Sequence, residues 1–430
     1  MSFGVGVIGA GVVGGGVIQT LRSNAQAIQA RTGVPVELVH VADKNPAVFD
    51  SFDMTGVTVS DDAGALLRDP NVSVVCELIG GIDPAKRFIL EALNAGKNVV
   101  TANKMLLAYH GPELCAAAVE AGADLRYEAA VAGGVPIIKA LREGLAAGGI
   151  DLVCGILNGT CNYILTRMTY DGLEFDGVLK QAQELGFAET PPDLDVEGHD
   201  TAHKCQIIAS LACGSEVDLG DILVEGITHV THSDVAYARE MGYVIKLLAI
   251  VRNINGEIEA RVHPTLVRED HLLASVRNEF NAVYVDADIT GPTLYYGKGA
   301  GRLPTASAVV ADIIDIGRRG GAQAPPPFTY GERRPVRDSG RLEGRYYLRL
   351  TTRDQPGVLG QACTILGNHG VSIASCIQHE GHSNDAVHVV MMTHDTRESD
   401  LRAALDEIDQ CAFMVRPARL LRVLDHGMKG

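Results

Sequence analysis

The sequence contains no tryptophan, and aromatic residues make up only 5% of its 430 residues. It also lacks any apolar run of the roughly 18 residues that a membrane-spanning helix needs. Apolar residues nevertheless amount to 46% and charged residues to 21%, which is typical of a globular protein rather than of a disordered or fibrous one. We therefore expect a soluble chain with hydrophobic cores and no membrane partner.

Basic residues are outnumbered by acidic ones, 37 against 53, which gives a net charge of −16. Proteins that hold nucleic acid through its phosphates usually present basic surfaces, so we expect no nucleic-acid partner. A small cationic or zwitterionic ligand remains compatible with this charge. The first residues, MSFGVGVIGAGVVGG, lack the basic segment and the cleavage site of a secretory signal, which predicts a cytoplasmic location.

The nine cysteines are scattered singly, and no CxxC pair occurs. This spacing argues against a disulfide framework and against a zinc knuckle. We expect most of the cysteines to be small buried hydrophobic residues.

The length favours two or three domains, and the first segment, VGVIGAGVVGGGVIQTLRS, predicts a strand, a glycine turn and a helix. Gly9, Gly11 and Gly14 fit the pattern GxGxxG. In that pattern the glycines permit a tight turn, the approach of a pyrophosphate to bare backbone, and close packing of helix on strand. Further apolar strands follow at 36–43, 72–80 and 97–104. Residues 1–127 are therefore predicted to form a Rossmann dinucleotide-binding domain of the α/β class.

The second predicted strand ends at Asp43, which is followed directly by Lys44. An acidic residue at this point accepts from the 2′-hydroxyl of NAD, whereas a cation accommodates the 2′-phosphate of NADP. The sequence leaves the choice between NAD and NADP open.

Beyond the first domain we predict an α+β domain at 128–320, a linker at 321–344, and a separate module at 345–425. Gly133 and Gly134, followed by Pro136, mark a backbone turn, which is either a plain loop or a place where carbonyls face a ligand or ion. The linker is rich in Gly, Pro and Arg without apolar periodicity. The last module shows the order βαββαβ, which predicts a ferredoxin-like unit.

The stretch DLDVEGHDTAHK places several ionisable side chains within twelve residues. His199 and His203 have the i, i+4 spacing of two zinc ligands on a helix, although no third ligand is evident. Asp200 and Lys204 have the same spacing, which also fits an exposed ion pair that contributes little. A third interpretation is a pocket for an amino acid, in which carboxylates hold the ammonium group and the lysine acts on a hydroxyl.

Several motifs in this order resemble those of the homoserine dehydrogenases. The resemblance covers residues 1 to about 320, and the C-terminal module, with DQPGVL and GNHGVSI, resembles an ACT domain. The motifs that carry it are AQELGFAETPPDLDVEGHDTAHK (182–204), GILNGTCNYIL (155–165), TANKMLLA (101–108), EAAVAGGVPII (128–138) and GKGAGRLPTASAVV (297–310).

The resemblance implies an NAD(P)-dependent oxidoreductase that interconverts L-homoserine and L-aspartate 4-semialdehyde, a reaction of threonine, methionine and isoleucine biosynthesis. It implies that Lys204 is the acid/base and that Lys104 lies beside nicotinamide and substrate. It also implies that Glu189 and Asp200 bind the amino-acid part of homoserine, with Asp195 as a further contact.

The same resemblance implies cofactor contacts at Val13, Gly186 and Gly301. It also implies a monovalent cation, Na⁺ or K⁺, held by backbone groups of four residues, Glu128, Val131, Gly133 and Val135.

In the C-terminal module, two turns are candidates for binding an amino-acid effector, because turns offer backbone N–H groups to a carboxylate. The first contains Asp354 and Gly357, and the second contains Asn368 and Gly370. Pathway logic and the resemblance suggest threonine as the effector. Modules of this kind commonly pair between subunits, so we expect a homodimer or a homotetramer.

Two other classes of function share parts of this pattern. Another NAD(P)-dependent amino-acid or aldehyde reductase would have the Rossmann domain but need not keep the acidic loop. A non-catalytic nucleotide sensor would lack the ionisable set, yet Lys104, Glu189, Asp200 and Lys204 are all present.

Overall fold

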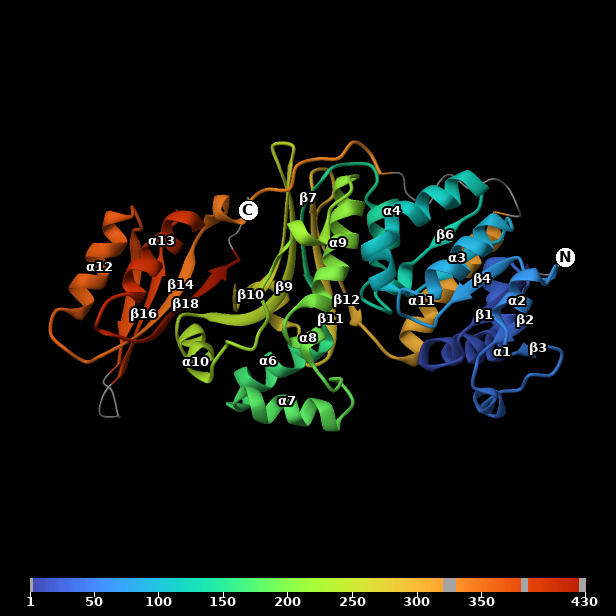
Figure 1. The fold of residues 1–430 in the computed structure, drawn as a ribbon, viewed down its shortest axis with the longest axis horizontal. Helices are drawn as coiled ribbons and strands as arrows, with labels where there is room; N and C mark the ends of the chain where they lie inside the picture. The colour runs from blue at the N-terminus through green and yellow to red at the C-terminus, as the bar shows by residue number, and fades with distance from the viewer. Residues whose placement is uncertain (1–2, 320–329, 380–385, 425–430) are drawn as a thin grey trace.

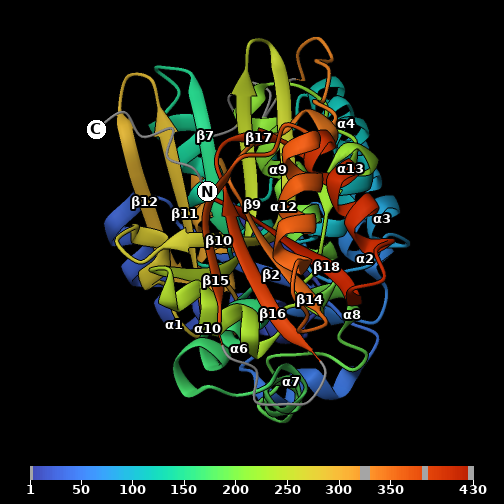
Figure 2. The ribbon, with the colours of Figure 1, turned by 90° about the vertical axis from the view of Figure 1, so that its left-hand side faces the viewer.

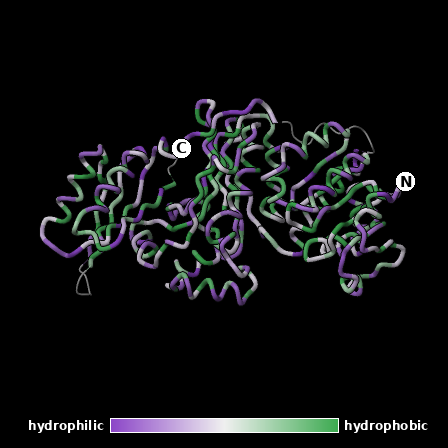
Figure 3. Tube along the Cα trace, viewed as in Figure 1, coloured by the Kyte–Doolittle hydropathy of each residue, from purple (hydrophilic) through white to green (hydrophobic). Residues whose placement is uncertain are grey.

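The structure, a computed structural model, describes residues 3–319, 330–379 and 386–424. It is elongated, with an N-terminal unit at one end, a C-terminal module at the other and a large mixed sheet between them (Figure 1). Figure 3 shows apolar stretches along the central strands and hydrophilic stretches on the outer turns. In the described part of the chain, no helix is long and apolar enough to cross a bilayer.

The N-terminal unit is a six-stranded parallel sheet in the order β3-β2-β1-β4-β5-β6, which confirms the predicted Rossmann fold. Its strands are β1 (Phe3–Ile8), β2 (Val36–Ala42), β3 (Thr58–Ser60), β4 (Val74–Glu77), β5 (Asn98–Thr101) and β6 (Leu125–Arg126). The connecting helices are α1 (Val12–Thr32), α2 (Ala63–Arg68), α3 (Ala85–Asn94) and α4 (Lys104–Ala121). The sequence did not predict β3 and β6, which are too short to show an apolar pattern.

The glycines from the end of β1 into the first turns of α1 allow one tight turn and two close approaches of backbone. Gly9 has a φ of 94°, a value that suits glycine. A Cβ on Gly14 would lie 1.8 Å from the carbonyl oxygen of Gly9, and a Cβ on Gly16 would lie 2.4 Å from the carbonyl oxygen of Arg302. The run therefore permits the turn, the packing of α1 on β1, and the packing of α1 on the distant helix α11 (Arg302–Arg318).

Helix α11 follows the central domain in the sequence but packs on the N-terminal unit. Its residues Val309 and Ile313 share a buried cluster with Val5 and Val7 of β1. In Figure 1 the helix lies among the N-terminal elements. Residues 302–318, which the sequence analysis assigned to the central domain, thus complete the apolar cover of the dinucleotide-binding sheet.

The middle of the molecule is a ten-stranded mixed sheet that extends into the C-terminal module. Its path is β12-β11-β7-β9-β10-β18-β14-β16-β15, with β8 beside β10. The central strands are β7 (Ile150–Ile156), β8 (Leu223–Val224), β9 (Tyr243–Ile254), β10 (Glu257–Arg268), β11 (Phe280–Ala287) and β12 (Gly291–Lys298). The helices around them are α6 (Gly159–Asp171), α7 (Phe175–Glu184), α8 (Asp193–Val196), α9 (His199–Cys213) and α10 (His232–Glu240).

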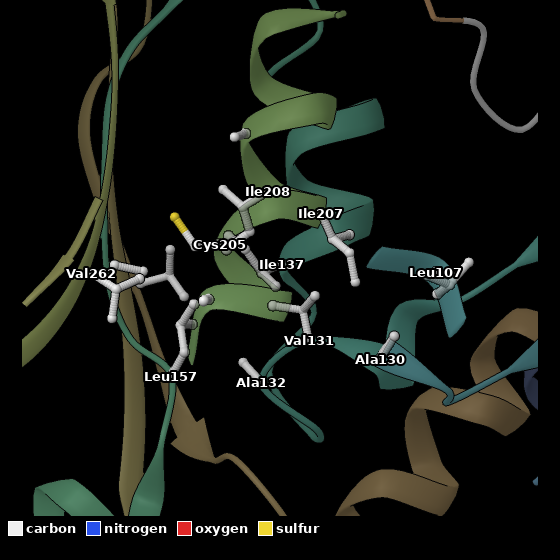
Figure 4. Close-up of a cluster of buried hydrophobic side chains, with 14 of the residues drawn as sticks. Leu107, Ala130, Val131, Ala132, Ile137, Leu157, Cys205, Ile207, Ile208 and Val262 are labelled. Carbon is white, nitrogen blue, oxygen red and sulfur yellow. The ribbon is translucent and has the colours of Figure 1, made fainter. Parts of the chain in front are cut away.

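Helix α9 is fixed by an apolar cluster on its inner side. Cys205 and Ile208 of α9 are buried in one core with Leu157, Val131 and Val262, and Figure 4 shows these side chains gathered around the helix. Because the core sets the rotation of α9, it also sets the direction of the polar residues in its first turn.

The C-terminal module has the predicted βαββαβ order (Figure 2). Its main elements are β14 (Tyr346–Thr352), α12 (Val358–Asn368), β15 (Ile373–Gln378), β16 (Val387–Thr393), α13 (Glu398–Asp409) and β18 (Met414–Val423). Strand β18 pairs with β10 in parallel, Thr265 with Arg422 and Leu266 with Val423. The module is therefore joined to the central sheet through backbone hydrogen bonds.

The predicted linker is described from residue 330 onward, and residues 320–329 lie outside the described chain. Its described part lies along the central domain. Arg334 donates to the carbonyl oxygens of Cys213 and Gly256 at 3.2 and 3.0 Å, and Val336 bridges to Ile258.

Candidate active site

The polar centre of the molecule is the carboxylate of Asp200, in the first turn of α9. Its Oδ2 lies 2.6 Å from Nζ of Lys204, and its Oδ1 lies 2.7 Å from Nζ of Lys104. Lys204 is one helical turn further along α9, whereas Lys104 begins α4 of the N-terminal unit. The carboxylate therefore links the two domains through two lysines.

The burial of this cluster separates it from an ordinary surface ion pair. The side chains of Asp200 and Lys204 are 4% and 11% exposed, while that of Lys104 is 37% exposed. The interpretation of Asp200 and Lys204 as an exposed pair is therefore wrong, although their spacing is the same. Lys104 alone of the three reaches toward solvent.

Asn158, immediately after β7, organises the acidic side of the site. Its Oδ1 accepts from the backbone N–H of Cys161 at 2.8 Å and so caps α6. Its Nδ2 donates to Asp195 Oδ1 at 2.7 Å and to Asp200 Oδ2 at 2.9 Å. One amide group thus holds two carboxylates at a fixed separation.

Asn158 lies within the motif GILNGTCNYIL, but no role was predicted for it from the sequence. Its place before the helical stretch GTCNYIL is typical of an N-cap, which was the available signal. Its contacts with Asp195 and Asp200, 37 and 42 residues away, carry no signal in a single sequence.

Lys204 also donates to the carbonyl oxygen of Leu157 at 2.7 Å. A lysine ammonium has three donors, and the bonds to Leu157 and Asp200 use two of them. The third can point to the oxygen of a bound ligand, and the first two fix the direction in which it points.

Charge and burial move the pKa values in this cluster in different directions. Burial alone would raise the pKa of Asp200, but the ammonium groups of Lys204 and Lys104 hold it well below its usual range. Burial lowers the pKa of Lys204, and the positive charge of Lys104 lowers it further, against the opposing effect of Asp200. Lys204 is therefore an amine that loses its proton more readily than an exposed lysine.

The pKa values of Lys104 and Asp195 are both raised. Although burial opposes it, the carboxylate of Asp200 raises the pKa of Lys104, so Lys104 stays charged. Burial raises the pKa of Asp195, and the neighbouring Asp200 adds to that rise. The site thus combines a firmly charged lysine with a lysine that is poised to exchange a proton.

The remaining predicted residues between α7 and α9 lie outside the cluster of Asp200 and the two lysines. Glu189 is exposed, and it acts on Lys104 only through its field, which raises the pKa of that lysine. Asp193 and Asp195 lie on the short helix α8. Gly186, after α7, has a φ of 74°.

The two histidines of the zinc interpretation do not form a metal cluster. His203 packs edge-on against the ring of Tyr109 at 5.6 Å, and His199 is exposed at the start of α9. Over the described residues, no group of three or more His, Cys, Asp or Glu side chains could hold a metal ion.

The carboxyl ends of the parallel strands carry a cleft of about 460 Å³ that includes Gly9, Asp43, Lys44 and Arg87. Asp43 closes the glycine turn, because its Oδ2 accepts from the N–H of Ala10 at 2.7 Å. This is where open parallel sheets bind nucleotides.

The glycine turn beside this cleft has room for a diphosphate. A Cβ on Gly11 would meet no atom within 4 Å, so the backbone is open to a ligand at the N-terminus of α1, where anions are stabilised. Val13 lies in the first turn of that helix. Gly301, with a φ of 123°, precedes α11, which packs on the same helix. These residues fit a dinucleotide.

The predicted cation loop is a compact turn. The carboxylate of Glu128 accepts from the N–H groups of Ile138 and Lys139 at 2.9 and 2.8 Å. Ala132 and Gly133 have φ values of 54° and 49°, so consecutive residues adopt the left-handed conformation. The carboxylate of Glu128 thus closes the loop from inside, which leaves the carbonyl groups as the possible ligands of an ion.

The two predicted effector turns lie at opposite ends of α12. Gly357, with a φ of 89°, precedes the helix, and Asn368 ends it, with Gly370 shortly after. The helix has 11 residues, so the turns are about 16 Å apart at 1.5 Å per residue. A single small molecule cannot contact both turns of one chain.

We predict that replacing Asn158 with aspartate destabilises the protein in a pH-dependent way. The Asn158→Asp variant keeps the helix cap but turns a donor into a third carboxylate facing Asp195 and Asp200. Because crowding raises the carboxyl pKa values of the folded state, the loss of unfolding free energy should grow as pH rises through them, to about 3 kcal/mol. Denaturant unfolding between pH 5 and pH 8 measures this.

The matched control for this prediction is Asn158→Ser, which keeps a cap acceptor without adding charge. Its loss of stability should change little with pH. A loss for Asn158→Asp that is equal at both pH values would contradict the assigned contacts.

Family models and known relatives match nearly the whole chain. The family model described as "Homoserine dehydrogenase" matches residues 136–314, that of its NAD binding domain matches 9–128, and that of the ACT domain matches 346–413. The chain is 43% identical to a homoserine dehydrogenase of Pseudomonas aeruginosa over 428 residues, covering 97% of this chain and 98% of that one.

It is 42% identical to a homoserine dehydrogenase of Neisseria gonorrhoeae over 426 residues, with 97% and 98% of the two chains covered. Among solved structures, a homoserine dehydrogenase from Thiobacillus denitrificans is similar with a TM-score of 0.93 and 42% identity, covering 99% of each chain. The chain therefore belongs to the homoserine dehydrogenase family of NAD(P)-dependent oxidoreductases and carries a C-terminal ACT domain.

Proposed function

We propose that Lys204 is the acid/base in the interconversion of L-homoserine and L-aspartate 4-semialdehyde. The observation that carries the proposal is the buried cluster in which Asp200 and Leu157 orient the Lys204 ammonium group at 2.6 and 2.7 Å. When the aldehyde is reduced, Lys204 donates its proton to the carbonyl oxygen. When homoserine is oxidised, the neutral Lys204 amine takes the hydroxyl proton.

We assign the recognition of the amino-acid part of the substrate to Glu189, Asp195 and Asp200. Asp195 is half-buried beside Asp200, and its carboxylate is held by Asn158. A carboxylate oriented in this way suits the ammonium group of homoserine, because charge-assisted hydrogen bonds are strong when partly desolvated. Lys104, firmly charged at the mouth of the cluster, is suited to orient the substrate and to keep the Lys204 pKa low.

The cofactor in this proposal is NADP or NAD, bound across the glycine turn with contacts from Gly9, Gly11, Val13 and Gly14. Bound nicotinamide supplies the hydride chemistry. Lys44 and Arg87 line the cleft and can accommodate a 2′-phosphate. Asp43 already accepts from two backbone N–H groups, of Ala10 and Asn45. A hyperthermophilic archaeal homoserine dehydrogenase, 25% identical, has been solved in complex with NADPH.

A pair of glycines and a cation loop complete the proposed site. We propose Gly186 and Gly301 as further cofactor contacts, because both are exposed glycines with positive φ, 74° and 123°, where a ligand can approach the backbone without meeting a side chain. We also propose a monovalent cation, Na⁺ or K⁺, on the carbonyl groups of the Glu128–Val135 loop. Its left-handed turn at Ala132 and Gly133 supports this assignment.

We predict that two substitutions next to Lys204 shift the pH dependence of homoserine oxidation in opposite directions. Lys104→Met removes a positive charge that lowers the Lys204 pKa, so the alkaline rise of kcat should move to higher pH. Asp200→Asn removes a negative charge that raises it, so the rise should move to lower pH. Lys204→Ala should lower kcat by about 10²- to 10⁴-fold. Initial rates between pH 6 and pH 11 measure all three.

The control is Lys86→Met, which removes a surface lysine that pairs with Glu113 at 2.7 Å and should leave the profile unchanged. Shifts of the same sign in Lys104→Met and Asp200→Asn, or near-normal turnover in Lys204→Ala, would remove Lys204 from the mechanism.

We further propose that the ACT domain binds an amino-acid effector, with threonine as the first candidate, and that the enzyme is a homodimer or homotetramer. The separation of the two turns along α12 supports an effector site shared by two subunits. One subunit would contribute the turn with Asp354 and Gly357, and its partner the turn with Asn368 and Gly370. An effector that favours a less active state would then inhibit.

Removing the whole module is a poor test of this proposal. A chain that ends near Arg337 would lose the strand β18 that pairs with β10. It would also lose Arg349, which donates to the buried carboxylate of Asp234 at 2.6 Å. Loss of activity after truncation would therefore report damage to the central domain rather than the role of the effector.

We predict instead that the point variants Asp354→Ala and Asn368→Ala each weaken inhibition by threonine while leaving the uninhibited rate unchanged. Both side chains are exposed, so the fold should tolerate their loss. The shift in half-inhibitory concentration should fall within about 5- to 150-fold. Glu343→Gln removes an exposed carboxylate just before the module and serves as the control. A wild-type enzyme that is indifferent to millimolar threonine contradicts the proposal.

A further inference from the structure

An ion cluster in which Arg422 and Glu398 are buried joins the C-terminal module to the central domain. Arg422 of β18 donates to Glu225 at 2.8 and 3.0 Å and to Glu398 at 2.8 and 2.6 Å. Arg402 of α13 reaches the same two carboxylates, Glu225 at 3.1 Å and Glu398 at 2.7 Å. Glu225 is the only one of these four residues that comes from the central domain.

Glu225 belongs to a short segment, Val224–Ile227, that supports the helix α8. The N–H of Ile227 donates to the carbonyl oxygen of Val196, the last residue of α8, at 2.8 Å. A Cβ on Gly226 would lie 2.2 Å from that same oxygen, so the two backbones are in direct contact. The N–H of Glu225 is itself fixed by the carbonyl oxygen of Val262 in β10 at 2.8 Å.

The backbone that rests on this segment carries both carboxylates of the active site. Asp195 immediately precedes Val196 on α8. Gly198 lies just before α9, and Asp200 is the second residue of that helix. A Cβ on Gly198 would lie 3.4 Å from the carbonyl oxygen of Glu225. The Val224–Ile227 segment therefore supports the connection between Asp195 and Asp200.

We infer that Glu225 is a positioning residue for substrate binding, through which Arg422 and Arg402 of the ACT domain set the placement of Asp195. The path has three steps. The guanidinium groups fix the Glu225 side chain, its backbone segment supports Val196, and Val196 carries Asp195. This inference rests on the proposed role of Asp195 in holding the substrate.

The cluster is not needed merely to attach the module. A second buried ion pair lies between Arg349 and Asp234, which also accepts from the hydroxyl of Tyr347 at 3.0 Å, and β18 pairs with β10 through its backbone. Asp234 lies on α10 rather than on the Val224–Ile227 segment. Loosening Glu225 should therefore leave the module attached.

The test compares Glu225→Gln with Glu257→Gln. The two side chains are similarly exposed, at 25% and 27%, and each pairs with an arginine that follows the central domain. Glu257 pairs with Arg341 at 2.8 Å, far in sequence from α8. Glu225→Gln should raise the KM for homoserine roughly 2- to 30-fold, with kcat and the cofactor KM within about twofold of wild type. Glu257→Gln should change none of them.

A double-mutant cycle with Asp195→Asn then separates this inference from the proposed function. If Glu225 acts through Asp195, its effect on KM should largely disappear in the Asp195→Asn background. An unchanged KM in folded Glu225→Gln, an equal rise in Glu257→Gln, or full additivity with Asp195→Asn would each overturn the inference. An Asp195→Asn enzyme with normal KM would instead overturn the proposed role of Asp195.

A second variant, Arg402→Gln, tests the inference if Glu225→Gln folds poorly. Arg402 is 49% exposed and contacts the same cluster from its outer side, so Arg402→Gln should fold and raise the KM for homoserine in the same direction by a smaller factor. A folded Arg402→Gln enzyme with wild-type KM would also overturn the inference.

Discussion

The structure depends on one buried carboxylate that is shared by two lysines. A carboxylate as enclosed as that of Asp200 costs several kcal/mol in desolvation, and removing either partner of such a pair costs about 3–5 kcal/mol. The fold meets this requirement by bringing α4 of one domain to α9 of another, so that Lys104 and Lys204 approach opposite oxygens. The same contact that neutralises the charge places the nucleotide-binding domain beside the proposed substrate site.

Each part of the fold contributes one element of this arrangement. The parallel sheet ends at the glycine turn and at Lys104, the central domain presents α8 and α9, and the ACT domain extends the central sheet through β18. The apolar core around Leu157 and Cys205 fixes the rotation of α9. Asymmetry in burial then gives two lysines of the same chemistry opposite pKa shifts, which suits Lys104 to the proposed role of a fixed charge and Lys204 to that of a proton donor and acceptor.

Local patterns in the sequence predicted much of this, because strand–glycine–helix order and the βαββαβ order depend on neighbouring residues. The resemblance to the homoserine dehydrogenases, rather than any local pattern, singled out Lys104, Asp200 and Lys204, which the structure brings together. Burial of the Asp200–Lys204 pair was not predictable, since i, i+4 spacing is the same on an exposed face. Nor were the contacts of Asn158, the packing of α11 on α1, or the pairing of β18 with β10, because these join residues far apart in the chain.

The proposed division of roles depends on a difference in proton affinity between the two lysines, which their surroundings produce. The direct measurement is a pH titration of the lysine side-chain resonances by NMR in selectively labelled enzyme, with Lys104→Arg and Lys204→Arg used for assignment. We expect a Lys204 midpoint below the ordinary lysine value of about 10.4 and a Lys104 midpoint above it. Two midpoints at the ordinary value, or the reverse order, would contradict this expectation.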